Sequence, residues 1–411
     1  MPSQISSSST PEDSRLAPIE PGGLPPEDPA MSNTVEHALD TASIAAAPEG
    51  SGTAVASQWK LMWWKFRKHK LAMIGTVITI LIYLVAIFAE FLAPNSPYTS
   101  FSQYAYAPPQ PLHLFDTSDG FRFSFHADGY TSTVDTTSFK RVYEPDSSVS
   151  VPMGFFVHGR HYTFLGVIST NRHFVGPKNA SDTVFILGTD RLGRDMLSRL
   201  IYGARISMSI GLLGVLLSVV LGIVLGGISG YYGGRIDDVI QRFIEVIRSI
   251  PTIPLWMGLA AALPPGWSAI RVYFGITIIL SFIGWTGLAR VVRGRFLALR
   301  SEDFVTAAKL DGSSEARIIL RHMVPSFASH IIASVTLSIP AMILAETSLS
   351  FLGLGLRPPI VSWGVLLQEA QNIRTVATAP WLFAPGVAIV ITVLAMNFMG
   401  DGLRDAADPY R

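Results

Sequence analysis

The sequence predicts an all-α polytopic membrane protein with six transmembrane helices and a β-rich segment between the first two. Three observations predict this class. Of the 411 residues, 49% are hydrophobic and only 15% are charged, whereas soluble domains carry roughly 25% charged residues. The mean hydropathy is +0.38. Six segments are apolar over the length that a helix needs to cross a hydrocarbon core, roughly 20 residues.

The composition and the missing motifs exclude several classes of function. A net charge of +1 argues against nucleic-acid binding, which needs a basic surface. There is no cysteine, which excludes disulfides and thiol nucleophiles. No Gly-x4-Gly-Lys-Ser/Thr motif is present to bind nucleotide phosphates, and the histidines do not fall at metal-ligand spacings. We therefore expect no catalytic residues, no metal and no cofactor.

Two segments precede the first span. Residues 1–57 are rich in Ser, Pro, Ala and acidic residues and hold few large apolar side chains, so we expect a disordered cytoplasmic tail. They lack the basic start and apolar core of a signal peptide. Residues 58–70 combine tryptophans with lysines and arginines, which predicts a helix lying at the inner surface of the lipid bilayer.

The six apolar stretches contain a single acidic or basic residue, Glu346, apart from one histidine in the same stretch. The first predicted transmembrane helix occupies residues 71–92, and the second to sixth belong to a transmembrane domain of residues 205–411. The apolar stretches are Leu71–Ala89, Ile206–Gly234, Ser249–Ile270, Val272–Ala289, Ser326–Phe351 and Thr375–Gly400.

Lysine and arginine set the orientation when they are counted in short loops. With the N-terminus inside, the inner segments hold 17 of them and the outer short loops hold three, Arg271, Arg357 and Arg374. We therefore expect a multi-pass protein with both termini in the cytoplasm.

Residues 93–204 form the predicted insertion on the outer side. Residues 121–126 alternate between apolar and polar side chains, and residues 161–168 are expected to form another strand. These patterns predict a small β-rich extracytoplasmic domain. We expect residues 93–187 of it to meet a partner protein.

Prolines and one carboxylate mark candidate pathway residues. Pro251, Pro254 and Pro264 make the third span irregular, which membranes tolerate only where protein or a cavity covers the freed backbone. Pro251 and Pro254 are therefore pathway candidates. Glu346 is a candidate too, although we favour a structural role in which it bonds the ends of neighbouring helices.

Glycines recur at every fourth position in the second span, at Gly222, Gly226, Gly230 and Gly234. Small residues at this spacing form a smooth stripe on one helix face, which lets another helix approach closely in lipid. We expect this stripe to pack against a neighbouring helix, with a hinge as the alternative.

Residues 301–325 form a polar island between the fourth and fifth spans. We expect Ser301 to cap a short helix, with Glu302 and Asp303 in its first turn. Gly312 permits the left-handed turn that ends this helix. A second helix is expected from Ser313 or Ser314, ending at Pro325.

The first of these helices has one predicted apolar edge. Phe304, Val305 and Ala308, together with Leu310, are expected to share it. Ala307 and Ala308 keep the helix slim, so that the groove of a partner could accept it. Without further information, an ordinary amphipathic loop is as good an interpretation of these residues.

The order Glu302-x4-Ala307-Ala308-x3-Gly312, with Pro325 thirteen residues later, resembles the coupling loop of ATP-binding-cassette (ABC) importer permeases of the dipeptide, oligopeptide and nickel type. Further motifs of this family stand in order over roughly half of the chain. They are Gly188–Asp195, Ser198-Arg199, Tyr202–Ser207, Leu349–Gly355, Pro358-Pro359, Ser362–Gly364, Asp401–Asp405 and Asp408-Pro409. The sequence departs from the family in its long N-terminal tail and in Ser326, where asparagine often stands.

The resemblance implies a fold, partners and roles. It implies the type I ABC importer fold in a bacterial inner membrane, with a second homologous permease completing the pathway. Two cytoplasmic ABC ATPase subunits would dock on the coupling loops, and a periplasmic solute-binding protein would deliver the substrate. By this resemblance Glu302, Ala307, Ala308, Gly312 and Pro325 contact or shape the ATPase interface.

The leading hypothesis is therefore the transmembrane subunit of an importer that takes up peptides at the expense of ATP. An oligosaccharide is an alternative substrate within the same family, because a fold does not fix its ligand. An ion-coupled secondary transporter is the alternative from another class, and the absence of charge pairs inside the spans argues against it. A membrane-anchored receptor would need one span, whereas six are predicted.

Overall fold

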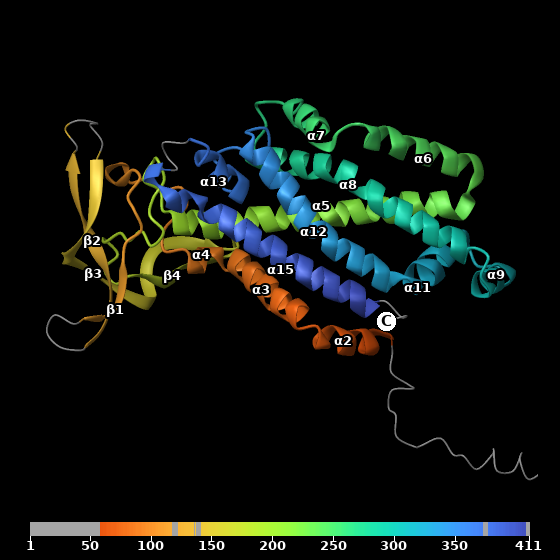
Figure 1. The fold of residues 1–411 in the computed structure, drawn as a ribbon, viewed down its shortest axis with the longest axis horizontal. Coiled ribbons are helices and arrows are strands. Elements are labelled where there is room, and N and C mark those ends of the chain that lie inside the picture. The colour runs from red at the N-terminus through yellow and green to blue at the C-terminus, as the bar shows by residue number, and fades with distance from the viewer. Residues whose placement is uncertain (1–57, 117–121, 135, 137–140, 373–376, 408–411) are drawn as a thin grey trace, which may run out of the picture. The chain divides into compact units, whose positions relative to one another are not determined.

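The computed structural model describes residues 58–411 with the exception of 117–121, 135, 137–140, 373–376 and 408–411 (Figure 1). The predicted disordered tail, residues 1–57, lies outside the described residues, as do Asp408 and Pro409 of the last motif. The described chain is mostly helical, with one antiparallel sheet near one end of the helices.

Long helices make up the bundle. α5 packs against α8, α12 and α3, and α15 packs against α3 and α12. The helices are α2 (Gln58–Lys68), α3 (Lys70–Ile87), α4 (Ala89–Leu92), α5 (Met196–Tyr232), α6 (Gly234–Ser249), α7 (Thr252–Ala261), α8 (Ala269–Leu299), α9 (Asp303–Leu310), α10 (Glu315–Arg317), α11 (Val324–Ser326), α12 (Ala328–Phe351), α13 (Trp363–Glu369) and α15 (Ala384–Ala407), with short η1 (Ser102–Tyr104), η2 (Ile318–Met323) and η3 (Pro380–Phe383).

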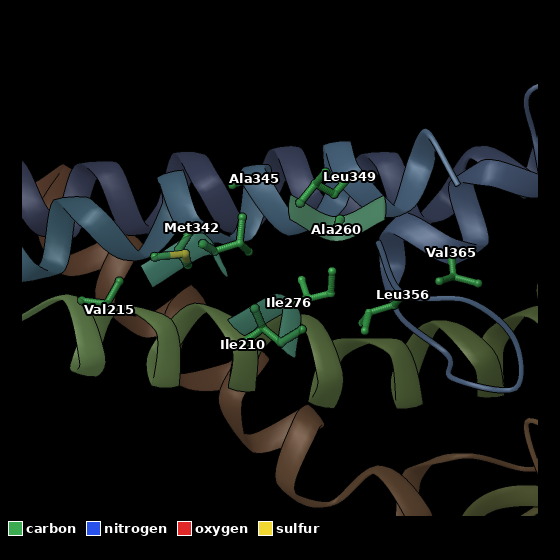
Figure 2. Packing of buried hydrophobic residues seen from close by; sticks show 10 residues of the cluster. Ile210, Val215, Ala260, Ile276, Met342, Ala345, Leu349, Leu356 and Val365 are labelled. Carbon is green, nitrogen blue, oxygen red and sulfur yellow. The ribbon is translucent and has the colours of Figure 1, made fainter. Parts of the chain in front are cut away.

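One apolar core joins α5, α7, α8, α12 and α13 (Figure 2). Ile210 of α5, Ile276 of α8 and Leu349 of α12 are almost fully buried in it. Each helix contributes a stripe of apolar side chains that only a neighbouring helix can cover. The outward faces of the same helices remain apolar, as in a helix whose other side contacts lipid.

Within the described residues, five helices are long and apolar enough to cross a membrane, or up to six if the bent pair α6 and α7 counts as one span. The five are α3, α5, α8, α12 and the stretch Pro380–Ala407. The predicted sixth span begins at Thr375, which lies outside the described residues, and its regular helix begins only at Ala384.

The third predicted span, residues 249–270, is irregular, as its prolines predict, and it is not a single helix. α6 and α7 meet at an angle of 89°, and α7 is only ten residues long. Pro251 stands at the N-cap of α7, and Pro264 and Pro265 follow its end. Proline lacks the backbone N–H that a helix interior needs, so the apolar stretch breaks instead of continuing.

The second span begins earlier than predicted, at Met196 instead of Ile206. Asp195 is the reason, because its side chain accepts hydrogen bonds from the backbone N–H groups of Leu197 and Ser198 at the start of α5. This is the usual N-cap arrangement. Residues 196–204 of α5 therefore lie within the segment predicted as an insertion.

The glycine stripe packs against α8, as predicted. A Cβ atom on Gly226 would lie 2.4 Å from the carbonyl oxygen of Ala289, and one on Gly230 would lie 2.7 Å from that of Arg293. Gly222 meets Leu288 in the same way. Gly234 is not part of the stripe, because α5 ends at Tyr232 and Gly234 has a positive φ of 54° in open space.

The sheet has the strand order β1-β2-β3-β4 with antiparallel pairing. Its strands are β1 (Leu112–Asp116), β2 (Arg122–Val134), β3 (Arg141–Phe164) and β4 (Ile168–Pro177). The prediction of a single strand over residues 161–168 is wrong. β3 ends at Phe164, and the chain turns at Leu165 and Gly166, which have φ of 48° and 75°, before β4 begins.

A buried histidine holds the sheet to the end of the first long helix. The ring of His173 in β4 lies with Nδ1 2.8 Å from the carbonyl oxygen of Ala93 and Nε2 3.0 Å from that of Arg160. Ala93 directly follows α4, and Arg160 is part of β3. The ring therefore lies between the segment that follows α4 and strand β3.

Candidate functional site

The coupling segment, residues 301–325, joins α8 to α12 at the end of the bundle opposite the sheet (Figure 1). α9 begins with Glu302 as its N-cap, so the expectation that Ser301 is the cap is wrong. Ser301 still belongs to the turn that follows α8, where its hydroxyl donates to the carbonyl of Ala298 at 3.3 Å. Glu302 caps with backbone geometry alone.

The predicted end of the first short helix is confirmed, and that of the second is not. Gly312 has a φ of 71° and its N–H donates to the carbonyl of Lys309 at 3.1 Å, as expected for a left-handed turn that ends a helix. Ser314 is the N-cap of α10, and a π-helical turn follows it. Pro325 does not end a helix, because it stands in the first turn of α11, where its missing N–H costs nothing. The break comes at Phe327 (φ −126°).

One face of the coupling segment is built into the bundle. Val305 is fully buried and Ala308 is 8% exposed. The apolar cluster around them draws on the last turns of α8, on the π-helical turn and on the start of α12. Its buried members are Val292, Phe296, Val305, Ala308, Ile318, Met323, Phe327 and Ile331. A displacement of α9 would therefore also displace α8 and α12, because closely packed side chains transmit movement.

The other face of the segment has exposed apolar side chains. Leu310 is 84% exposed, Leu320 is 66% exposed and Phe304 is 40% exposed, and Ala307 is exposed as well. The expectation that Phe304 and Leu310 share an edge with Val305 and Ala308 is wrong. Val305 and Ala308 are three residues apart and share the face of this eight-residue helix that the bundle covers, so Phe304 and Leu310 lie on other faces.

Two tyrosines fasten the segment to the end of α5. The hydroxyl of Tyr232 donates to Glu315 Oε2 at 2.5 Å, and the ammonium of Lys309 lies 5.4 Å from the ring centre of Tyr231. Such contacts at an exposed site are individually weak. Together they link both short helices of the segment to the helix that carries the glycine stripe.

An ion pair between a buried carboxylate and a partly exposed arginine links α5, α6 and α8 beside the segment. Asp237 of α6 accepts from both sides of the Arg293 guanidinium, with Nε at 2.5 Å. The hydroxyl of Ser229 in α5 donates to the same carboxylate at 2.5 Å. A two-point bond between arginine and carboxylate fixes geometry as well as charge.

Glu346 lies fully buried in α12 and is surrounded by hydroxyl groups (0% exposed). Its carboxylate accepts from Ser350 at 2.8 Å, from Ser362 at 2.8 Å and from Ser207 at 3.2 Å. Each of these serines also accepts a backbone N–H, including that of Trp363 on Ser207. The arrangement bonds α12, α5 and the start of α13 to one another, which agrees with the structural alternative for Glu346.

A second polar cluster, the outer network, consists of Asp190, Arg194, Arg199 and Glu369. Asp190 accepts from Arg194 Nε at 2.6 Å and from Arg199, and Arg194 donates to Glu369 at 2.8 Å. Asp190 is fully buried and Arg199 is 1% exposed. The network joins the loop before α5 to α13.

Asp195 lies next to the outer network. Its carboxylate is buried among Asn95 and Ser198, which donate to it, and burial raises its pKa to about 6. The desolvation of the charged form outweighs the hydrogen bonds that favour it.

The proline-bearing segment has an open environment. Pro251 and Pro254 are both exposed at the start of α7, as are the two residues between them. A hollow of about 250 Å³ lies at the far end of α7, next to Pro358 and Pro359. A larger one of about 640 Å³ lies between the starts of α5 and α8, lined mainly by Tyr98, Tyr202, Arg205, Ser209, Tyr273 and Phe274.

Metal binding has no candidate in the part of the chain that the structure describes, where no group of three or more His, Asp or Glu side chains could hold an ion.

The structure also reveals bonded residues that the sequence patterns do not single out. Asp237 and Arg293, and the tyrosines at the end of α5, are the main ones. The partners stand far apart in the sequence, so spacing alone could not pair them.

Comparisons with known proteins agree with these motifs. A family model described as "Binding-protein-dependent transport system inner membrane component" matches residues 218–410. A second, described as "N-terminal TM domain of oligopeptide transport permease C", matches residues 57–109.

Three relatives are similar over much of their length. The oligopeptide transport system permease protein OppC of Bacillus subtilis (strain 168) is 31% identical over 370 residues, which cover 89% of this chain and 95% of the relative. The dipeptide transport system permease protein DppC of the same organism is 40% identical over 54% of this chain and 68% of the relative. OppC of Escherichia coli (strain K12) is 42% identical over 54% and 71%.

Proposed function

Because the chain belongs to the family of binding-protein-dependent transport system inner membrane components, we propose that it is a transmembrane subunit of an ABC importer for peptides. The observation that carries this proposal is the coupling segment. It has one face packed into three long helices and another that leaves Leu310 84% exposed at the end of the bundle.

Peptides are the substrate class that the relatives support. Two relatives with high coverage are named for oligopeptide transport and one for dipeptide transport. An oligosaccharide is the alternative within the same family, since related permeases can share a fold and differ in cargo.

The energy for transport would come from partners. Two cytoplasmic ATPase subunits would bind the exposed face of the coupling segment, on this chain and on a second, homologous permease. Glu302, Ala307 and Gly312 would shape that interface, and the buried Val305 and Ala308 would pass its movement to α8 and α12. Buried apolar contacts suit this task, because packed cores deform little.

The remaining parts fit a type I importer fold in the inner membrane with both termini in the cytoplasm. α6 and α7 would together make the third, broken span, and α2 would lie on the inner surface. Such a break is compatible with a membrane where the second permease or a cavity covers the freed backbone. Pro251 and Pro254, exposed at the start of α7, would face that covered space.

Residues 93–195, the part of the predicted insertion that precedes α5, would then form a periplasmic segment that meets the solute-binding protein or the second permease. Deleting residues 93–187 should reduce uptake and leave ATPase docking intact. Uptake that is unchanged after the deletion would contradict this role.

The proposal is tested by peptide uptake into vesicles that contain both permeases, the ATPases and the binding protein. Uptake should require ATP, and Gly312→Pro should abolish it with assembly intact, because proline cannot adopt a φ of 71°. Gly312→Asn is the matched control, since asparagine tolerates this conformation. Uptake that survives without the ATPases and stops when a proton gradient is removed would instead identify a secondary transporter.

A further inference from the structure

The turn between β3 and β4 exposes a group of large apolar side chains. Val167 is 83% exposed, Ile168 is 59% exposed and Leu165 is 54% exposed. We call these three residues the hairpin tip. Surface apolar residues scattered singly need no explanation, whereas three together at the end of a projecting hairpin do.

Contacts with the first long helix place the hairpin tip. The ring of Phe164 stacks on that of Phe88 with centres 5.6 Å apart. Both β3 and β4 also contact α4, the short helix that follows α3. Phe88 directly follows the last residue of α3, Ile87, so the tip lies beside the end of this helix, as Figure 1 shows for β4 and α4.

The length of α3 gives the depth of the tip in the membrane. The helix has 18 residues from Lys70 to Ile87, which is about 27 Å at 1.5 Å per residue. A hydrocarbon core is about 30 Å thick. With Lys70 at one boundary, Phe88 lies at the other boundary, and so does the tip.

The surface of α3 continues into the hairpin tip. Leu84 and Ile87 are 42% and 45% exposed on the outside of the bundle, and Phe88 is 41% exposed. Side chains on this part of a membrane-spanning helix contact lipid chains. The apolar side chains of the hairpin tip therefore continue the apolar surface at the end of α3.

The order of side chains along the hairpin also fits an interface. Behind the apolar tip comes Tyr162, whose hydroxyl donates to the carbonyl of Arg172 at 2.6 Å, and then the exposed pair His158 and Arg172 on opposite strands. Apolar, aromatic and basic residues in this order follow the change from hydrocarbon to headgroups.

The backbone of the tip gives an independent reason to expect a role for Leu165. This residue has a φ of 48°, a conformation that glycine or asparagine adopts far more readily. A leucine that is both disfavoured by its backbone and half exposed contributes little to the fold of the isolated chain.

We propose that the hairpin tip, Leu165, Val167 and Ile168, inserts into the lipid leaflet at the C-terminal end of α3 and contacts acyl chains there. The insertion fixes the position of the sheet relative to the membrane. It rests on the proposed function only in that the bundle is membrane-embedded, and not on what the protein transports.

The insertion is tested with a fluorescent label in lipid nanodiscs. The chain has no cysteine, so Val167→Cys in the full chain can be labelled at one position with a polarity-sensitive dye. Lipids with a nitroxide near the start of the acyl chain should quench this label at least twofold, and its emission should shift to the blue. Aqueous iodide should quench it little.

A label at Glu144→Cys is the control, because Glu144 is exposed on β3 where this strand pairs with β2. It should respond to iodide and not to the nitroxide lipid. Iodide quenching of the Val167 label as strong as that of the control would overturn the proposal. Protection of the Val167 label from both quenchers would overturn it too, because a protein partner would then cover the tip.

This outcome is independent of transport. If uptake assays contradict the peptide importer and the Val167 label is still quenched from the acyl chains, the insertion stands by itself. If uptake is as proposed and the label is exposed to water, the insertion alone is wrong.

Discussion

The coupling segment and the outer network lie at opposite ends of the same bundle, and they use polar and apolar residues in opposite ways. In the outer network, Asp190 and Arg199 are buried and bonded within the chain. In the coupling segment, the charged residues are exposed, and Leu310 and Phe304 are exposed with them.

This difference separates a structural task from a binding task. A buried network of charges is costly to disturb and holds helix ends in one arrangement. Exposed apolar side chains on a short helix contribute almost nothing to the stability of the fold, so contact with a partner is the better reason for their apolar character. The two ends should therefore respond oppositely to substitution: the outer end in stability, the coupling segment in transport.

The largest expected effect on stability is at Arg199. Arg199→Ala leaves the buried carboxylate of Asp190 with only Arg194 to compensate it, and should lower the free energy of unfolding by about 3–5 kcal/mol. Denaturant unfolding in detergent measures it. Arg242→Ala is the control, because the Arg242–Glu245 pair is exposed and should contribute only about 0–1 kcal/mol. An equal loss of unfolding free energy in both variants would contradict the greater importance of the buried network.

Glu346→Gln decides between the two roles considered for this carboxylate. Three serine hydroxyls donate to Glu346, and an amide cannot accept from all of them, so the free energy of unfolding should fall by about 1–3 kcal/mol. Uptake per folded molecule should change little. A variant that is as stable as the parent and does not transport would instead place Glu346 in the pathway.

Gly226→Ala tests the close approach of α5 and α8. Its Cβ would lie 2.4 Å from the carbonyl oxygen of Ala289, and backbone cannot move aside as a side chain can, so the cost should be about 1–3 kcal/mol of unfolding free energy. Gly287→Ala on α8 is the matched control, with no heavy atom within 4 Å. It should be neutral or stabilising by about 0.5–1 kcal/mol. The same loss in both variants would show that helix propensity, and not packing, is responsible.

The smallest effect on stability is expected at Leu310. Leu310→Asp changes a side chain that is 84% exposed, so the free energy of unfolding should change by less than about 0.5 kcal/mol. ATP-dependent uptake should fall about tenfold, the loss expected when one apolar contact of about 1.4 kcal/mol is removed from an interface. Leu192→Asp, in the loop before α5, changes a side chain that is also exposed and should leave uptake unchanged.

Local features of the chain were predictable where a single segment decides them. Gly312 and the glycines of α5 are examples, because a left-handed turn or a close helix contact needs a residue without a side chain. The irregularity of the third span was also predictable, because proline cannot stand in a helix interior, and the chain bends where Pro251 precedes α7.

Contacts between distant segments were not predictable from the sequence. Glu346 depends on Ser207 and Ser362, which belong to other helices, and Asp237 depends on Arg293. The division of α9 into a buried and an exposed face also required the structure, because Phe304 and Val305 are adjacent and equally apolar. Only the packing of α8 and α12 decides which of them is covered.

The central claim is that the exposed face of the coupling segment binds an ATPase subunit. The most direct measurement is site-specific cross-linking in the assembled transporter, with Ala307→Cys carrying a short photoactivatable group on a chain that has no other cysteine. We expect a cross-link from residue 307 to the ATPase and none from Leu192→Cys. A cross-link to the ATPase from position 192, with none from 307, would contradict it.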